Sequence, residues 1–234
     1  MSPLSIKAAM VSHAAHQAVG QKRKYTNEPY WKHPEAVADM VRKVDGASEQ
    51  MVAAAYLHDV LEDTQMTVLD LKELFGETVA SYVHDLTDQF TDPGLGNRAH
   101  RKALERDRLA AISPNAQTIK YADLIDNTCS IVGRDPGFAS VYLVEKRRLL
   151  EVMDKGDRVL YRMALVLLET GTEKVNQFMA EHRANTYKVS INGHHKKTVF
   201  SEQDAWAVIG QAPFGSLYSV LDADNNTRPE FVPY

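Results

Sequence analysis

Helical periodicity covers most of this chain and limits its fold more than any other feature. Apolar residues recur at helical spacing from about Pro3 to Arg183. Ser48 and Thr67 stand directly before two of these apolar runs, at positions where helix N-caps are expected. The sequence therefore predicts a mainly α fold, with a helical domain over residues 1–183.

The character of the chain changes after His182. Two stretches of alternating residues, joined by a turn at Gly193-His194, predict a pair of strands, and a short helix and a third strand follow. The tail, 225–234, is rich in turn-forming residues and has room for one more short strand. We expect a small α+β domain of ββαβ order over residues 186–234, with its elements at 187–192, 196–201, 202–210 and 215–223. No residue in this segment decides its role.

The amino-acid composition excludes several classes of function. The 234 residues are 44% hydrophobic and 25% charged, which is ordinary for a globular protein. A net charge of −4 and a pI of about 6.1 argue against a strongly basic nucleic-acid binder. The sequence has no run of the ~18 apolar residues that a membrane span needs, and residues 1–10 lack the features of a secretory signal. We therefore expect a cytoplasmic protein that binds a small molecule, without nucleic acid or membrane as a partner; a homo-oligomer is left open.

Histidine is the residue type through which this chain can hold a transition metal. It has nine histidines but a single cysteine, Cys129. One cysteine can form neither a disulfide within the chain nor a cysteine-rich zinc cluster. A metal site must therefore use histidine and carboxylate ligands.

The segment LHDVLEDT, residues 57–64, is the sharpest local feature. His58 and Asp59 are adjacent on a helix that is otherwise apolar, where charged groups need partners or a metal. Glu62 and Asp63 follow one turn later, at i+4 from His58 and Asp59. We expect one histidine and three carboxylates on one helix around one point. The alternative is a solvated acidic face with a stray histidine.

Two other segments supply complementary ligands. Asp123 lies in a mostly apolar helix with Asn127 one turn after it, and pairing with a lysine is the alternative role for Asp123. His33 precedes a proline at a helix start, where an N-cap side chain can project away from its own helix; a simple surface cap is its alternative. Two histidines and two aspartates suit Mn²⁺, Fe²⁺, Co²⁺ or Zn²⁺, with open positions for water.

Other polar residues fit the handling of a phosphate ester. Glu62 and Asp63 are placed to hold and deprotonate a metal-bound water. Arg23 and Lys24, which lie in a loop, would face anionic phosphates. Asn127 is suited to bond a ribose hydroxyl or the scissile phosphate.

Several short motifs follow one another in a recognisable order. They are Ala-His, Gly-Gln and Arg-Lys within 15–24, EPY and HP within 28–34, LHDVLEDT at 57–64, FGETVASYVHDLTD at 75–88, NRAHRKALERDRL at 97–109 and KYADLIDN at 120–127. In this order, the chain resembles the HD-domain phosphohydrolases over about residues 5–155. Within them it is similar to the hydrolase domain of the RelA/SpoT enzymes and to the small alarmone hydrolases.

The resemblance implies a role for each matching residue. Glu62 and Asp63 match the pair that activates the attacking water, and Arg23 and Asn127 match nucleotide and phosphate contacts, with Lys24 adjacent to Arg23. The residues that match the metal ligands, which usually hold Mn²⁺, are His33, His58, Asp59 and Asp123. The family reaction removes the 3′-pyrophosphate of guanosine tetra- or pentaphosphate and releases GDP or GTP.

The chain also departs from the family pattern. After Asp123 the family usually has a basic residue, and often Leu-His or Leu-Tyr before the Asn, whereas Leu124, Ile125 and Asp126 stand here. This difference affects the expected contacts to the base or the 5′-phosphates, but not the metal. The chain is too short to include a synthetase domain of this family, so degradation alone is expected. Residues 186–234 match no part of the family.

Two further functions remain open from the sequence. One keeps the same chemistry on another nucleotide, such as (p)ppApp, the 2′-phosphate of NADPH or a deoxynucleotide. The other is a non-catalytic HD module that senses nucleotides. The complete ligand set and the intact Glu62-Asp63 pair favour an enzyme over the second alternative.

Overall fold

The computed structural model describes residues 2–213, 216–228 and 231, and its chain divides into two compact units. The first unit comprises Met1–Ser130 and Val144–Leu168, and the second comprises Ile131–Leu143 and Glu169–Tyr234. The division therefore passes through three helices. The expected boundary between residues 183 and 186 rests on the change from helix to strand, and it stays a prediction.

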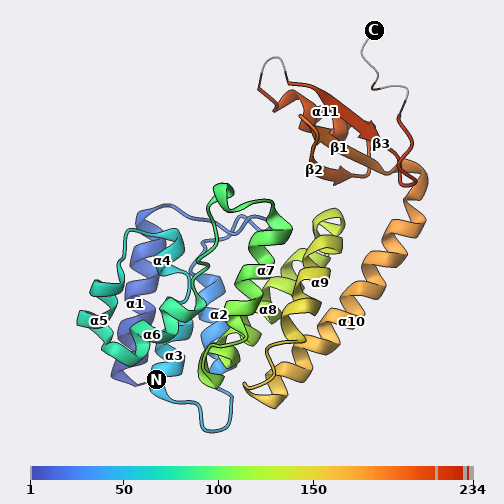
Figure 1. Cartoon of the computed structure of the whole chain (residues 1–234). Helices are drawn as coiled ribbons and strands as arrows, with labels where there is room; N and C mark the ends of the chain where they lie inside the picture. Colours follow the sequence, from blue (N-terminus) through green and yellow to red (C-terminus); the bar gives the residue numbers. More distant parts are fainter. Residues whose placement is uncertain (1, 214–215, 229–230, 232–234) are drawn as a thin grey trace. The chain divides into compact units, whose positions relative to one another are not determined.

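The fold is mainly α, as predicted, with a small antiparallel sheet near the C-terminus (Figure 1). The longer helices of residues 2–181 are α1 (Pro3–Ala18), α2 (Lys32–Val41), α3 (Glu49–Leu57), α4 (Val60–Asp63), α5 (Val68–Phe75), α6 (Glu77–Leu86), α7 (Arg98–Leu109), α8 (Pro114–Val132), α9 (Pro136–Leu150) and α10 (Arg158–Glu181). Within the described residues, no helix has both the length and the apolar character needed to cross a membrane.

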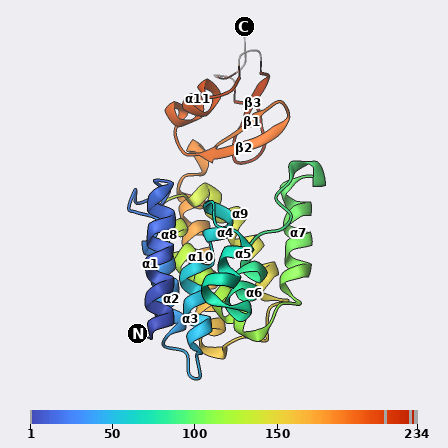
Figure 2. The ribbon, with the colours of Figure 1, turned by 90° about the vertical axis from the view of Figure 1, so that its left-hand side faces the viewer.

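Helix α3 forms the centre of the first unit. It packs against α1, α2 and α6, and Figure 2 shows it between α2 and α6. Every residue from Met51 to Leu57 is buried. Three consecutive alanines, 53–55, are completely buried, and their small side chains let neighbouring helices approach closely. Ser48 caps α3 by accepting a hydrogen bond from the Met51 N–H, as predicted. The last seven residues of α3 are buried, and the residue after its end, His58, also lies inside the unit.

Two local predictions were wrong, and both concern the site. The expected continuous helix over 57–63 is interrupted, because α3 ends at Leu57 and α4 begins at Val60. Adjacent residues in a regular helix point about 100° apart. The break at His58 and Asp59, where Asp59 has φ −100° and ψ −3°, lets both side chains face one point. His33 is not the N-cap of α2, since the chain already turns at Trp31 and His33 is the second helical residue.

The sheet of the second unit has the order β2-β1-β3, with antiparallel pairing on both sides of β1. The predicted ββαβ order is confirmed, although the hairpin turn is at Asn192-Gly193, one residue earlier than expected. Both of these residues have positive φ, which suits a tight hairpin turn. The elements are β1 (Tyr187–Ile191), β2 (His194–Val199), α11 (Glu202–Gly210) and β3 (Tyr218–Leu221).

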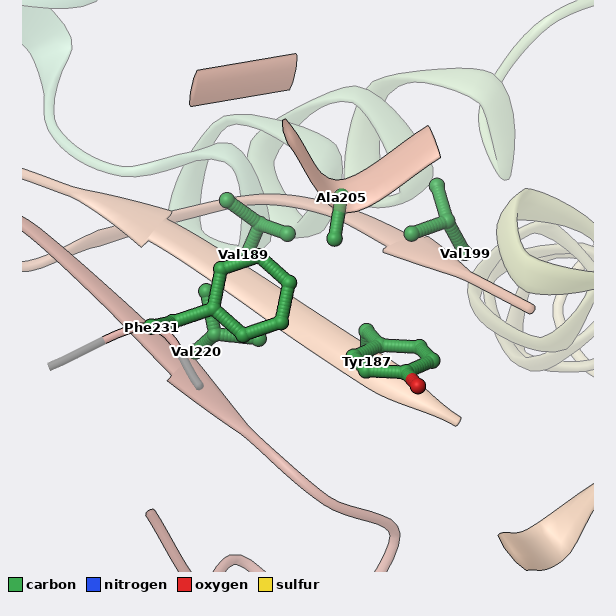
Figure 3. Close-up of a cluster of buried hydrophobic side chains, with 6 residues drawn as sticks. All are labelled: Tyr187, Val189, Val199, Ala205, Val220 and Phe231. Atoms are coloured by element: carbon green, nitrogen blue, oxygen red, sulfur yellow. The ribbon is translucent and has the colours of Figure 1, made fainter. Parts of the chain in front are cut away.

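The start of the expected third strand, residue 215, lies outside the described residues, and so do 229–230 and 232–234 of the tail. In the described part of the tail, Thr227 forms an isolated bridge with Leu221. One face of the sheet packs against α11 through a small apolar core (Figure 3), which consists of Tyr187, Val189, Val199, Ala205, Val220 and Phe231. This cluster gives residues 187–231 apolar packing of their own.

Candidate metal centre

Four side chains from three parts of the sequence converge in the first unit. His33, His58 and Asp59 offer ligand atoms that lie within 4.8 Å of one another. The Nε2 atom of His58 is 3.0 Å from Asp59 Oδ2 and 3.2 Å from His33 Nε2. Asp123, from α8, places Oδ1 3.2 Å from His33 Nε2 and 3.9 Å from His58 Nε2. The structure thus brings together the four residues predicted as metal ligands.

The hydrogen bonds of the two histidines leave their inner nitrogens free for a cation. His58 Nδ1 lies 2.9 Å from the carbonyl oxygen of Ala55, and His33 Nδ1 lies 2.7 Å from Asp126 Oδ2. Because each of these oxygens only accepts hydrogen bonds, each Nδ1 carries the hydrogen. In the neutral rings both Nε2 atoms then present lone pairs to one another and to the oxygens of Asp59 and Asp123. A cation satisfies such a set of acceptors, and this donor set fits a divalent transition metal.

The same geometry stabilises positive charge. His33 and His58 are each 2% exposed, and Asp123 is 5% exposed. Burial disfavours a charged His33, but hydrogen bonds with Asp123 and Asp126 outweigh it and raise its pKa to about 9. Burial likewise disfavours charge on Asp59, but the neighbouring His58 outweighs it and lowers the pKa of Asp59 below its ordinary value. The aspartates are therefore held as anions around the point where the two rings meet.

Two residues that the sequence analysis did not assign to the site hold the aspartates in place. The Tyr30 hydroxyl donates a hydrogen bond to Asp59 Oδ2 at 2.8 Å. Lys120 Nζ lies 2.8 Å from Asp123 Oδ2, which leaves Oδ1 of that carboxylate facing the histidines. Burial opposes charge on Lys120, but Asp123 and Asp88 outweigh it and raise its pKa. A signal for Lys120 was present, because it stands three residues before Asp123 on one helix.

The predicted catalytic pair lies on α4, directly after the helix break. Glu62 Oε1 accepts a hydrogen bond from the backbone N–H of Asp88 at 2.6 Å. Although Glu62 keeps an exposed surface, partial withdrawal of its carboxylate from water and the charge of Asp59 raise its pKa to about 7. Asp63 is half-buried one residue further on. A carboxyl group with a pKa near 7 is suited to exchange protons at neutral pH.

Two of the three predicted substrate contacts adjoin the cluster. Arg23 Nη2 is 2.7 Å from Asp126 Oδ2, and Arg23 Nη1 is 3.5 Å from Asn127 Oδ1. Asn127 in turn donates from Nδ2 to Asp123 Oδ1 at 2.5 Å. Lys24 is exposed, and its ammonium group donates to the Tyr25 hydroxyl at 3.1 Å. Arg23 and Asn127 are thus tied to the cluster, whereas Lys24 extends toward solvent.

Comparison with known proteins identifies the class and then the branch. A family model described as "HD domain" matches residues 8–123, a segment that extends from α1 to Asp123. The guanosine-3′,5′-bis(diphosphate) 3′-pyrophosphohydrolase MESH1 of Xenopus tropicalis is 33% identical over 130 residues, covering 53% of this chain and 70% of that protein. The chain therefore belongs to the HD-domain family, in the branch that contains these pyrophosphohydrolases.

Other relatives agree with this assignment. A probable guanosine-3′,5′-bis(diphosphate) 3′-pyrophosphohydrolase of Synechocystis is 33% identical over 124 residues, which make up 52% of this chain but only 16% of that protein. A solved structure described as a metazoan ortholog of SpoT that hydrolyzes ppGpp superposes with a TM-score of 0.65 at 25% identity. It covers 73% of this chain and 96% of that chain.

Proposed function

We propose that this protein is a metal-dependent pyrophosphohydrolase that removes the 3′-pyrophosphate of guanosine tetra- and pentaphosphate. The observation that carries the proposal is the convergence of two imidazole Nε2 atoms with the carboxylates of Asp59 and Asp123. Membership of the pyrophosphohydrolase branch supports the choice of substrate. The activity named for the relatives contributes the guanosine nucleotide and the 3′ position.

In this proposal His33, His58, Asp59 and Asp123 hold Mn²⁺. When bound, a divalent cation supplies Lewis-acid chemistry, which makes a water molecule more acidic and offsets charge on phosphate oxygens. Tyr30 and Lys120 orient the two aspartates by their hydrogen bonds. Such outer contacts typically change metal affinity or activity by about 10- to 100-fold when they are removed.

Glu62 takes the proton of the attacking water at a carboxylate oxygen, and Asp63 assists it. The pKa of about 7 leaves Glu62 able to accept a proton and to give it up again at neutral pH. The oxygen of this water forms a bond to the phosphorus that is attached to the ribose 3′-oxygen, and the bond between that phosphorus and the 3′-oxygen breaks. The leaving 3′-oxygen takes up the proton that Glu62 gives up, so the products are pyrophosphate and GDP or GTP with a free 3′-hydroxyl.

The nucleotide is held by Arg23, Lys24 and Asn127. Arg23 retains N–H donors beyond the two that contact Asp126 and Asn127, since a guanidinium group has five. Lys24 provides mobile positive charge at the surface for the outer phosphates. The proposed partner is thus a small nucleotide in the cytoplasm. We further propose that residues 1–183 form the hydrolase domain and that residues 186–234 form a separate small domain.

A nucleotide panel tests the proposal. Purified protein is incubated with ppGpp, ppApp or NADPH, with Mn²⁺ or with a chelator, and the products are identified chromatographically. We expect GDP and pyrophosphate from ppGpp, only in the presence of Mn²⁺, and slower reaction with the other two. Faster turnover of ppApp or NADPH would assign the same chemistry to another nucleotide. Binding of ppGpp without turnover of any nucleotide would identify a sensing module instead.

A further inference from the structure

One carboxylate next to the candidate metal centre has two strong partners and no role in the function described so far. Asp126 Oδ2 accepts a hydrogen bond from His33 Nδ1 at 2.7 Å and one from Arg23 Nη2 at 2.7 Å. The side chain of Asp126 is 23% exposed and that of Arg23 is 13% exposed, so this ion pair is largely shielded from water. A single oxygen therefore joins a metal ligand of α2 to the arginine proposed to hold the nucleotide.

These contacts belong to a closed ring. From Arg23 the ring continues to Asn127 Oδ1 at 3.5 Å, and from Asn127 Nδ2 to Asp123 Oδ1 at 2.5 Å. Asp123 Oδ1 is 3.2 Å from His33 Nε2, which closes the ring. Two proposed metal ligands are thus connected to each other through Asp126 and through two of the three residues that are proposed to bind substrate. Asp126 is the member that links Arg23 to His33.

We infer that Asp126 is a positioning residue that couples metal binding at His33 to nucleotide binding at Arg23; this inference rests on the proposed function. Its carboxylate fixes the orientation of the His33 ring, keeps the hydrogen on Nδ1 and makes Nε2 a better ligand. The same oxygen anchors the guanidinium group of Arg23, so that its remaining donors point in one direction before the nucleotide arrives.

The bridging residue, Asp126, lies where this chain departs from the pattern of the family it resembles. In the family pattern a histidine or tyrosine often stands where Asp126 stands, and neither side chain is an anion at neutral pH when unperturbed. An aspartate at this position can accept hydrogen bonds from His33 and Arg23 at once, and it thereby links metal binding to nucleotide binding. The difference from the family pattern after Asp123 therefore changes the hydrogen-bond partner of Arg23 and His33.

Calorimetric titration of metal-free protein with Mn²⁺ tests the metal side. We expect Asp126→Ala to weaken the dissociation constant by about 10- to 100-fold, and Asp126→Asn to restore part of the loss because its amide oxygen still accepts a hydrogen bond. Asp39→Asn is the matched control, since Asp39 also pairs with an arginine, Arg42, but at the exposed side of α2. It should leave the dissociation constant unchanged.

Steady-state kinetics test the nucleotide side. Asp126→Ala should raise the KM for ppGpp, and Arg23→Ala should raise it much less in the Asp126→Ala background than in the wild type, since both residues act in one unit. Unchanged Mn²⁺ affinity in folded Asp126→Asn and Asp126→Ala, or additive effects on KM, would overturn the inference. If the wild type does not hydrolyse ppGpp, the Mn²⁺ titration still decides whether Asp126 supports the metal site. Failure of the inference and failure of the proposed function are thus distinguished.

Discussion

His33 and His58 each bond an acceptor through Nδ1, and this turns both Nε2 atoms toward one another. Two lone pairs 3.2 Å apart repel unless a proton or a metal lies between them and the nearby carboxylates. The chemistry of the site is therefore determined by two outer hydrogen bonds, one to the backbone of α3 and one to Asp126. At the scale of single residues, the hydrogen-bond partners of the two histidines orient the nitrogen atoms that face the metal site.

Substitution of Glu62 tests whether this residue affects the rate of hydrolysis without affecting Mn²⁺ binding. We expect Glu62→Ala to keep its Mn²⁺ dissociation constant but to lose about 10²- to 10⁴-fold in kcat, because a general base is removed and no ligand is lost. Calorimetry and initial-rate measurements on the same preparation provide both values. Glu77→Ala, at an exposed position on α6, serves as the control. Loss of Mn²⁺ from Glu62→Ala would mean that Glu62 is itself a ligand.

The burial of Lys146 predicts an unusual dependence of the free energy of unfolding on pH. It is 1% exposed and donates to Thr128 Oγ1 at 2.7 Å, and burial lowers its pKa to about 8. A lysine in the unfolded chain has a pKa of about 10.4, so between these values the unfolded state binds more protons than the folded state. The free energy of unfolding should therefore gain up to about 3 kcal/mol as the pH rises through this window.

Urea unfolding at about pH 7.5 and about pH 10 measures this effect. Other groups titrate in the same range, so the comparison is made against Lys146→Met, which keeps a similar chain length without the charge. This variant should be the more stable protein at the lower pH and should lack the gain. An equal change with pH in both proteins would show that the Lys146 ammonium group is not destabilised by burial.

At the scale of elements, the sequence predicted helix starts better than it predicted the geometry of the site. Ser48 and Thr67 cap helices as expected, because capping depends on residues three positions apart. The interruption at His58 and Asp59 could not be predicted, since apolar periodicity continues through it. At the interruption, His58 and Asp59 contact Asp123 and His33, which lie far away in the sequence.

The cap of α5 permits a quantitative prediction. Thr67 Oγ1 accepts from the Asp70 N–H at 3.2 Å, and Asp70 Oδ2 accepts from the Thr67 N–H at 2.8 Å, which is a reciprocal capping box. Thr67→Ala should lower the free energy of unfolding by about 1 kcal/mol in urea titrations. Thr78→Ala, at an exposed position in α6, should change it by less than about 0.5 kcal/mol. Equal effects of the two substitutions would argue against the cap.

At the scale of the whole molecule, the sequence identified the ligand set but not the way it is held. His33, His58 and Asp123 could be predicted because each stands in a recognisable motif. The bridge through Asp126 could not, because Asp126 departs from the pattern and its partners are contributed by two other segments. All four candidate ligands and the catalytic pair lie in the first unit, and none lies after Leu168.

This arrangement predicts that damage to the C-terminal sheet leaves the metal site intact. Val189→Asp places a charge in the fully buried core around β1 and should unfold that segment. We expect rapid proteolysis within residues 186–234, together with an unchanged Mn²⁺ dissociation constant. Lys196→Asp, at an exposed position of β2, should resist the protease as the wild type does. Loss of Mn²⁺ binding in Val189→Asp would mean that the two parts do not behave as separate domains.

The most direct measurement follows pyrophosphate release from ppGpp while metal-free protein is titrated with Mn²⁺. With His33, His58, Asp59 and Asp123 as ligands, release should be absent without the cation and should saturate at about one ion per chain. It should disappear in Asp59→Ala, which lacks one of the ligand oxygens. Equal release from chelator-treated protein, or from Asp59→Ala, would contradict a metal-dependent hydrolase built on these four residues.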